Sequence, residues 1–269
     1  MIDSAQTILI TGASSGVGHE TARLLAERGY KVFGTSRKSQ PADMHPNVEM
    51  LKLDVRSEDD VRTCVEAAGR IDVLVNNAGF ELAGAIEETS IEELAAQFET
   101  NFFGVARMIK AVLPAMRQRR QGRIINVSSL ATVAPIPFMA GYSASKSALE
   151  AYTESLRHEV RPFNIHVSMV EPGFLKTSMM EHRQVARTQV SDYDRWRRRA
   201  FAAISAAEHR GPGPDLVAQT IQHIVESQKP RLRYMTGRQA SVVSRLQRWL
   251  PESMFENGVR RNFSLDSGE

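Results

Sequence analysis

The sequence predicts an α/β fold in which a doubly wound parallel sheet is covered by helices on both faces. Short β-rich runs alternate with amphipathic helical stretches along most of the 269 residues. The β-rich runs are also apolar nearly throughout, which is typical of strands that are buried on both faces of a parallel sheet. Helical connections between successive strands give right-handed crossovers, and these wind the sheet in two directions.

The expected strands are recognised by short β-rich runs such as QTILIT near the N-terminus and IHVSMV in the second half. Each run is bounded by polar or glycine-containing stretches, as strands of this length usually are. In chain order the predicted strands are residues 6–11, 31–35, 48–53, 71–76, 122–129, 165–170 and 232–236.

The expected helices fill the intervals between these strands. Gly29 is a C-cap for the first helix, Ser57 is an N-cap for the second, and Pro162 stops the fourth. Pro114 lies near the end of the third, which is expected to be one long helix. The predicted helices are residues 19–28, 57–68, 91–119, 142–161 and 215–227.

The strict alternation lapses after about Phe174. Residues 177–213 are polar, contain methionines and arginines, follow a mostly helical pattern and end in the loop sequence GPGP. Ligands of doubly wound sheets bind outside the carboxyl ends of the strands, which is where this insertion begins. We therefore expect 177–213 to be a helical lobe that covers the substrate.

The length is compatible with a single domain, and we expect one domain over 1–269. No internal repeat and no low-complexity linker divides it. The tail, 239–269, is expected to pack on the body through Trp249, Phe255 and Phe263.

Composition excludes several classes. Hydrophobic residues make up 42% and charged residues 24%, which argues against disordered and fibrous proteins. No apolar run approaches the roughly 20 residues needed to cross a bilayer, and the mean hydropathy is −0.30. The N-terminal stretch carries Asp3 and no basic segment, unlike a signal peptide. Cys64 is the only cysteine, so no internal disulfide is expected, and no metal site. We expect a cytoplasmic protein.

Charge is uneven along the chain, although the net value is only +3. Residues 1–150 hold 16 basic and 18 acidic side chains, whereas 151–269 hold 18 basic and 13 acidic ones. No nucleic-acid-binding motif accompanies these arginines, so solvated helix faces are favoured over a nucleic-acid partner. The run from Arg195 to Arg199 is interpreted in the same way, with contact to an acyl or phosphorylated tail of a ligand as the alternative.

A glycine-rich loop follows the first predicted strand and reads TGASSGVG over residues 11–18. Glycines at such a strand-to-helix turn let backbone N–H groups approach a pyrophosphate at the helix N-terminus. The loop does not end in Gly-Lys followed by Ser or Thr, so a P-loop nucleoside triphosphatase (NTPase) is not supported. The placement therefore predicts a dinucleotide-binding loop of the Rossmann type.

The residues after the second strand indicate which dinucleotide is preferred. An acidic residue there binds a ribose 2′-hydroxyl, whereas arginine accepts a 2′-phosphate. This sequence has no acid at that point and places Ser36, Arg37 and Lys38 there. Arg37 can pair with phosphate through two N–H donors and Ser36 can add a hydroxyl. NADP(H) is therefore expected in preference to NAD(H), and the alternative is a solvated strand end.

A catalytic group is predicted around Tyr142 and Lys146, which stand at i and i+4 on one helix face. A nearby ammonium favours the phenolate and would lower the tyrosine pKa from its ordinary value of about 10. Ser129 ends the strand GRIINVSS, so it is expected at the same edge of the sheet as the glycine loop. Ser128 is expected to point to the opposite face, because side chains alternate along a strand.

These residues together resemble the short-chain dehydrogenases/reductases, in their single-domain branch. Within that family the closest likeness is to the 17β-hydroxysteroid and retinol dehydrogenase-like group. The features that carry the resemblance, in the family's order, are TGASSGVG (11–18), Asp54, NNAG (76–79), Asn101 in ETNFFG, Ser129 in NVSS, YSASK (142–146) and PGFLKT (172–177).

The resemblance implies a role for each catalytic residue. Tyr142 would donate a proton to the alkoxide in reduction or accept one in oxidation. Lys146 would lower the tyrosine pKa and bind the nicotinamide ribose, and Ser129 would polarise the carbonyl oxygen. Asn101 would hold a water that links Lys146 to solvent. The alternative is that its side chain forms a hydrogen bond with the helix backbone at a kink, and the two roles are compatible.

The resemblance also implies cofactor contacts beyond Tyr142 and Lys146. They run from the pyrophosphate and adenosine side, through the 2′-phosphate, adenine and ribose, to the carboxamide. In that order the expected contacts are Gly12, Ser14, Ser15 and Val17; Arg37; Asp54 and Val55; Asn77, Ala78 and Gly79; and Pro172, Gly173, Phe174 and Thr177.

The expected substrate is a lipophilic alcohol or ketone, such as a steroid or a retinoid, because the predicted lining is apolar and contains adaptable methionines. Several of these residues have an ordinary core position as the alternative, and His182 is more plausibly solvated than in contact with substrate. The lining residues are Phe80, Leu82, Leu130, Ala131, Pro135, Ile136, Phe138, Met139, Phe174, Met179, Met180 and Tyr193.

The function expected from the sequence is thus an NADP(H)-dependent oxidoreductase that interconverts a lipophilic secondary alcohol and a ketone. A non-catalytic nucleotide sensor or scaffold on the same fold would be expected to lack part of the Tyr, Lys and Ser set, which is complete here. A sugar-nucleotide epimerase or dehydratase would have a different glycine spacing and a longer C-terminal domain. By analogy with the family, the helices at 91–119 and 142–161 imply a homodimer or homotetramer. Membrane association is not expected.

Overall fold

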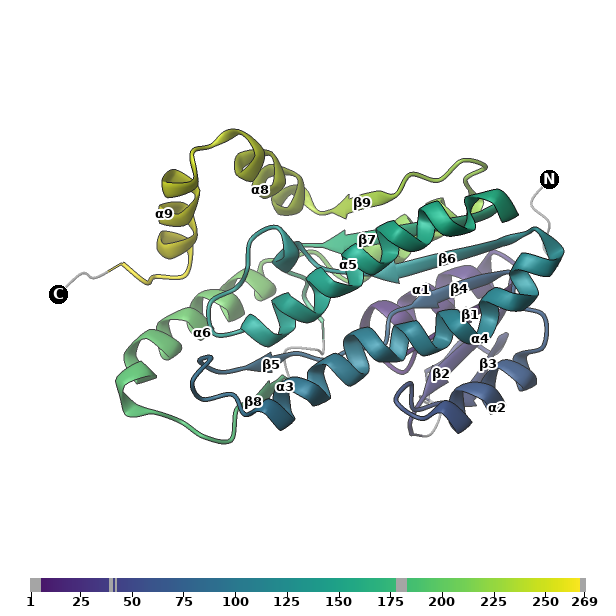
Figure 1. Cartoon of the computed structure of the whole chain (residues 1–269), viewed down its shortest axis with the longest axis horizontal. Coiled ribbons are helices and arrows are strands. Elements are labelled where there is room, and N and C mark those ends of the chain that lie inside the picture. Colours follow the sequence, from purple (N-terminus) through teal and green to yellow (C-terminus); the bar gives the residue numbers. More distant parts are fainter. Residues whose placement is uncertain (1–5, 39–40, 42, 178–182, 267–269) are drawn as a thin grey trace.

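The computed structural model describes residues 6–38, 41, 43–177 and 183–266, and it is built around one seven-stranded sheet (Figure 1). All neighbouring strands of this sheet are parallel, in the order β3-β2-β1-β4-β6-β7-β9. The strands are β1 (Thr7–Ile10), β2 (Lys31–Ser36), β3 (Val48–Lys52), β4 (Val73–Asn76), β6 (Gly122–Val127), β7 (Ile165–Pro172) and β9 (Arg233–Thr236). The predicted doubly wound α/β fold is confirmed.

Helices cover both faces of the sheet. Helices α1 and α7 contribute to one apolar core, and α2, α4 and α5 contribute to the other, so the central strands are buried on both sides. The helices are α1 (Gly16–Glu27), α2 (Glu58–Ala68), α3 (Ile91–Phe98), α4 (Gly104–Arg119), α5 (Ala140–Val160), α6 (Asp194–His209), α7 (Asp215–Glu226), α8 (Arg238–Trp249) and α9 (Glu252–Asn262).

Local signals position several helix ends as the sequence predicted. The Ser57 side chain accepts a hydrogen bond from the Asp60 backbone N–H and caps α2. Gly29 follows α1 with a φ of +86°, a conformation that glycine adopts without a steric penalty. Cys64 is buried on α2, and burial raises the pKa of its thiol to about 11, so it behaves as a packing residue.

The prediction of one helix over 91–119 is wrong in one respect. A π-helical turn, Glu99–Phe103, separates α3 from α4. Such a turn is frequent at functional sites because it displaces side chains from the regular helical positions. Here it places Asn101 in the interior, with no exposed surface. Pro114 lies inside α4 without ending it.

The predicted lobe contains more than helix. Two short strands that the sequence did not predict, β5 (Leu82–Ala83) and β8 (Gln184–Val185), pair in parallel and attach the segment after residue 182 to the loop after β4. Helix α6 then runs along this end of the molecule (Figure 1). Met179, Met180 and His182 lie outside the described residues.

The C-terminal segment forms an arm of two helices, α8 and α9, that extends from β9 beyond the edge of the sheet (Figure 1). Its last described part returns to the body: Phe263 is buried and its ring centroid lies 6.4 Å from that of Phe174. The expectation that Trp249 packs on the body is wrong, because its side chain is 79% exposed. Within the described residues, no helix is both long and apolar enough to span a bilayer.

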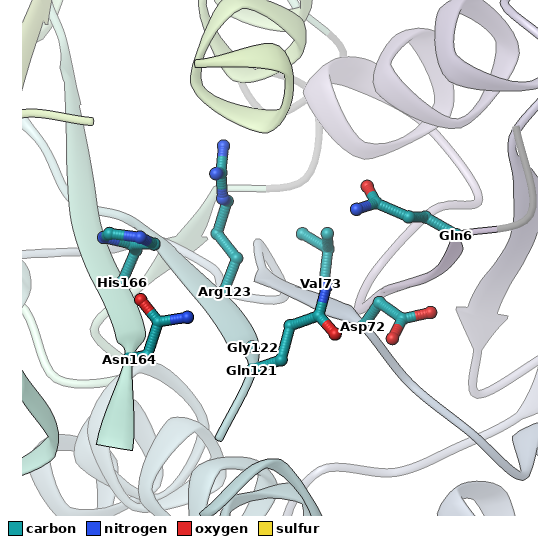
Figure 2. Close-up of a pocket in the computed structure, with 8 residues that line it drawn as sticks. All are labelled: Gln6, Asp72, Val73, Gln121, Gly122, Arg123, Asn164 and His166. Atoms are coloured by element: carbon teal, nitrogen blue, oxygen red, sulfur yellow. The ribbon is translucent and has the colours of Figure 1, made fainter. Parts of the chain in front are cut away.

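A small pocket of about 150 Å³ lies at the amino ends of the strands (Figure 2). Its polar groups serve the fold. Arg123 donates to the carbonyl oxygens of Val225 and Ser227, each at 2.7 Å, and Asp72 accepts from the Thr7 backbone N–H at 3.0 Å. A cavity of this size with occupied polar groups does not fit a dinucleotide, and ligands of parallel sheets bind at the opposite edge.

Candidate active site

A cavity of about 1330 Å³ opens at the carboxyl ends of the strands, between the sheet, the lobe and the C-terminal arm. Each residue that the sequence analysis assigned to the cofactor contributes to its wall, from Gly12 to Thr177. Ser129, Tyr142 and Lys146 line the same cavity, whereas Asn101 does not. The structure therefore brings the predicted dinucleotide loop and three of the four predicted catalytic residues into one space.

The glycine loop has the shape that a pyrophosphate requires. Gly12 has a φ of +68°, and a Cβ there would lie 2.8 Å from the Ala78 Cα, so only glycine fits. A Cβ on Gly18 would lie 2.3 Å from the Gly12 carbonyl oxygen, which lets α1 approach the strand closely. Ser15 precedes α1 without a side-chain cap, so the first-turn N–H groups remain available to an anion.

Asn77 lines the cavity as expected and has a further role, because its side chain binds the glycine loop. Its Nδ2 donates to the carbonyl oxygens of Thr11 and Gly12, each at 3.0 Å. The Thr11 hydroxyl oxygen in turn accepts from the backbone N–H groups of Asn77 and Ala78 at 3.0 Å. Asn77 thus fixes the glycine loop through its side chain, while its residue still lines the cavity behind Gly12.

Two arginines stand at the end where the adenosine is expected. Arg56 is bound to the Asp54 carboxylate, with Nη2 at 2.6 Å from Oδ2, and this hydrogen bond lowers the pKa of Asp54 to about 2. Arg37 is exposed at the end of β2, lines the cavity and has no ion-pair partner among the residues described. Its charge helps to lower the pKa of Asp54, and its place beside the dinucleotide cradle is where a 2′-phosphate would find a cationic partner.

The catalytic residues come from the end of β6 and the first turns of α5. Ser129 caps a short 3₁₀ turn, where its Oγ accepts from the Ala131 N–H at 3.1 Å and keeps its own proton for another acceptor. Tyr142 forms a hydrogen bond with Ser129. Lys146 donates to the Val127 carbonyl oxygen at 2.8 Å. Ser128 also lines the cavity, but its hydroxyl is turned to buried Glu150, to which it donates at 2.6 Å.

The expected lowering of the Tyr142 pKa is not what the free chain shows. Burial raises the pKa of Tyr142, and the negative charge of Glu81 adds to this effect, while the hydrogen bond with Ser129 opposes it. Lys146 is buried as well, which lowers its pKa to about 8, and its Nζ is engaged by Val127. The phenol is therefore held in its protonated form.

Asn101 lies beside Lys146 but its amide is taken up by protein groups. Its Oδ1 accepts from the Phe80 N–H at 3.1 Å, and its Nδ2 donates to the Phe80 carbonyl oxygen and to Ser145 Oγ. A Cβ on Gly79 would lie 3.1 Å from Asn101 Oδ1 and 3.8 Å from Lys146 Nζ. These contacts favour a positioning role for the side chain, and a bound water at Asn101 stays a prediction.

The predicted substrate wall is only partly formed by the residues named for it. Phe80, Leu130, Ala131, Ile136 and Phe174 line the cavity. Leu82 and Met139 are instead buried core residues, and Phe138 packs edge-on against Tyr193 and Phe201. An apolar wall that sequence reasoning missed comes from the C-terminal arm, through Val243, Leu246, Leu250, Met254, Phe255, Val259 and Phe263.

The arginine run 195–199 does not line the cavity. Arg197 is buried and pairs with Glu88 and Asp194, so it ties α6 to the loop after β5 rather than lying on a solvated face. The guanidinium carbons of Arg195 and Arg199 lie 5.0 and 5.4 Å from the Trp196 ring centroid. Contact of this run with a ligand tail is not supported.

Sequence reasoning also missed an ion cluster in the cavity wall, formed by Glu81, Arg183 and Glu208. Arg183 pairs with both carboxylates, and its Nε donates to Glu81 Oε2 at 2.8 Å. Glu81 and Glu208 line the cavity, and all three charges act on Tyr142. The cluster joins residues 102 and 25 positions apart, so no local sequence signal could have indicated it.

A dinucleotide cradle that opens beside a buried tyrosine, serine and lysine defines the class of nucleotide-dependent oxidoreductases. Residues 6–188 match the family model of the short chain dehydrogenases. The chain belongs to this family, whose members act on CH–OH and C=O groups.

Curated relatives extend over nearly the whole chain. A 3-ketodihydrosphingosine reductase from Bacteroides thetaiotaomicron is 43% identical over 267 residues, with coverage of 97% of this chain and 98% of the relative. Retinol dehydrogenase 8 from Bos taurus is 36% identical, with coverage of 88% and 83%. Both similarities agree with the family resemblance that the motifs indicated.

Solved structures show the same architecture. A short-chain dehydrogenase from Streptomyces avermitilis superposes with a TM-score of 0.80 at 31% identity, covering 98% of this chain and 96% of that one. A relative from Burkholderia phymatum in complex with NAD gives 0.75 at 26%, with coverage of 90% and 92%. ElxO with NADP bound gives 0.71 at 25%, with coverage of 86% and 96%.

Proposed function

We propose that the protein is an NADP(H)-dependent reductase of lipophilic ketones, with Tyr142 as the general acid. The observation that carries this proposal is the shared cavity, in which a buried tyrosine lines the same space as a dinucleotide cradle and an apolar wall. When bound, the nicotinamide supplies the hydride. The residues of the chain bind and orient the ketone and move the proton.

Ser129 and Tyr142 are placed to act on the carbonyl oxygen. Ser129 Oγ is fixed by the Ala131 N–H, so its proton can be donated to that oxygen as negative charge develops there. Tyr142 then donates its phenolic proton to the alkoxide. Burial favours the protonated phenol in the free chain, which suits the reductive direction, since oxidation requires a phenolate as the base.

Lys146 stabilises the negative charge that Tyr142 carries after it has donated its proton. Its Nζ is anchored on the Val127 carbonyl oxygen, one residue from Ser128, at the end of β6. With a pKa of about 8 the amine is mostly protonated at neutral pH, so its positive charge stabilises the phenolate that remains after proton transfer.

The apolar wall supports a substrate with a long aliphatic portion. Arm residues such as Leu246, Leu250 and Val259 add apolar side chains to the wall of the cavity that holds the catalytic group. Relatives named as a 3-ketodihydrosphingosine reductase and a retinol dehydrogenase support a lipophilic substrate, and the first name supports reduction of a ketone.

The cofactor preference predicts a clear effect of Arg37→Ala. We expect NADPH to bind wild type at least ~10-fold more tightly than NADH, about 1.4 kcal/mol, and the variant to lose that margin because the 2′-phosphate loses its guanidinium partner. Isothermal calorimetry with both cofactors measures it. The control is Arg62→Ala, an exposed arginine on α2 that pairs with Asp59 away from the cavity. Equal affinity of wild type for NADH and NADPH would overturn the preference.

If the substrate is a lipophilic ketone, kcat/KM should depend on the length of the ketone. For a series of unbranched 3-ketones, kcat/KM in the presence of NADPH should rise about fourfold per added methylene until the cavity is filled. Initial rates of NADPH oxidation measure this. A rate that is independent of chain length, or highest for the shortest ketone, would show that the arm does not form the substrate wall.

A further inference from the structure

The cavity wall contains a buried carboxylate with an unused acceptor atom. Glu208, at the end of α6, is 5% exposed. Its Oε1 accepts from Arg183, while its Oε2 is buried with no hydrogen-bond partner in the described part of the chain. Buried carboxylate oxygens are normally satisfied, so an orphaned one at a cavity points to a donor that arrives with a ligand.

This atom differs from the other orphaned polar atoms of the molecule. Among the described residues, buried side-chain atoms without a partner also occur in His19, Asn76, Arg119, Glu171 and Thr236, and none of these residues lines the large cavity. Glu208 alone among them does. Glu208 is thus the residue with an orphaned oxygen in the same cavity wall as Tyr142.

The two carboxylates of this cluster also have too little positive charge around them. One guanidinium, that of Arg183, serves the two carboxylates of Glu81 and Glu208. The other cation that acts on Glu208 is His209, whereas Lys146 acts on Glu81. Nearby His209 is exposed. Burial raises the pKa of Glu208, and Arg183 opposes this only in part, so a further cation would stabilise the charged carboxylate.

We propose that Glu208 Oε2, supported by the Glu81–Arg183 pair, is an ammonium subsite that selects ketones with a protonated amine within a few bonds of the carbonyl group. The ammonium donates to Oε2 and supplies the missing positive charge, while the carbonyl oxygen lies at Ser129 and Tyr142. The inference rests on the proposed ketone reduction and narrows it to long-chain amino ketones.

The cluster has an effect on Tyr142 that an ammonium would remove. Glu81 and Glu208 both raise the pKa of the phenol, and Arg183 offsets this only in part, so the cluster disfavours the phenolate formed when the proton is transferred. A bound cation between these carboxylates and the tyrosine would screen that repulsion. The phenolate of Tyr142 would thus be more stable with an amino ketone bound than with a ketone of the same length that lacks the amine.

The test compares two ketones on three proteins. The probes are 3-ketodihydrosphingosine, a long-chain 2-amino-3-ketone, and the same chain with hydrogen in place of the amine. We expect kcat/KM of wild type to favour the amino ketone by at least ~10-fold, and Glu208→Gln to reduce this ratio at least ~10-fold by removing the negative charge. A wild-type ratio near one, or an unchanged ratio in Glu208→Gln, would overturn the subsite.

Glu171→Gln is the matched control. Glu171 is also a buried carboxylate that pairs with an arginine, Arg233, and also has a free Oε2 and a pKa raised by burial, but it does not line the cavity. Its substitution should leave the ratio of the two ketones unchanged. A fall in the ratio for Glu171→Gln equal to that for Glu208→Gln would show a structural effect and overturn the subsite.

A binding measurement separates the subsite from the proposed function. If wild type reduces neither ketone, the proposed reduction is wrong, and calorimetry with dodecylamine and dodecanol decides the subsite without turnover. Binding of the amine at least ~10-fold more tightly than the alcohol supports the subsite, and equal binding overturns it. This comparison on wild type also serves if Glu208→Gln does not fold.

Discussion

Tyr142→Phe should lower kcat/KM for ketone reduction by about 10²–10⁴-fold, the range that a positioned general acid contributes. The variant keeps the ring and removes only the phenolic oxygen, so the packing of Tyr142 in the apolar cluster that also contains Ala131 and Met139 is retained. NADPH affinity should change little, because the ring of residue 142 stays in place and the other expected cofactor contacts, from Gly12 to Thr177, are untouched. Initial rates and calorimetry on the same preparation measure both quantities.

Tyr152→Phe is the control for this substitution. Tyr152 lies on the same helix, α5, and packs edge-on against Phe102 at a centroid distance of 5.6 Å, away from the cavity. It should retain nearly full activity. Comparable activity of Tyr142→Phe and Tyr152→Phe would contradict the assignment of Tyr142 as the proton donor.

Ser129→Ala should have the second largest effect, a loss of about 10²–10³-fold in kcat, because one hydrogen-bond donor to the developing oxyanion is removed. Folding should be affected little, since within the described residues Ser129 Oγ accepts from a single backbone group, the Ala131 N–H of a short 3₁₀ turn. Rates at saturating NADPH, together with thermal unfolding, separate the two effects.

Ser128→Ala should do the opposite of Ser129→Ala and lower the stability of the protein rather than its kcat. Ser128→Ala leaves the buried carboxylate of Glu150 without its hydroxyl donor, which costs about 1–3 kcal/mol of the free energy of unfolding. Its effect on kcat should be small. If Ser128→Ala lost activity and Ser129→Ala kept it, the assignment of the two hydroxyls would be reversed.

Local sequence signals were enough to predict the scaffold of this site. Apolar strands, helix caps such as Ser57 and the TGASSGVG loop depend on a few neighbouring residues, and the structure places them as expected. The order of the motifs then brings Ser129 and Tyr142 to one edge of the sheet, because all seven strands are parallel.

Features that depend on long-range contacts were not predictable in this way. The π-helical turn at Asn101 interrupts a sequence that is periodic enough for one helix. Tyr142 was expected to have a lowered pKa from its spacing to Lys146, but burial, which the spacing does not reveal, reverses the direction. The Glu81–Arg183–Glu208 cluster depends on the fold of the lobe. The expected homodimer or homotetramer stays a prediction.

The C-terminal arm shows why the substrate wall was only partly predicted. Its helices carry apolar residues on more than one side, so their pattern did not distinguish residues that line the cavity, such as Leu250, from exposed ones, such as Trp249. Only the return of Phe263 to Phe174 decides which side closes over the site.

The most direct test of the central claim is the transfer of label from NADPH to a ketone. Wild type is incubated with NADPH that carries deuterium at the transferable position and with an unbranched long-chain 3-ketone, and the product is analysed by mass spectrometry. We expect a secondary alcohol with one deuterium on the carbinol carbon, and almost none with Tyr142→Phe. If wild type formed no deuterated alcohol while binding NADPH normally, the assignment as a ketone reductase would be contradicted.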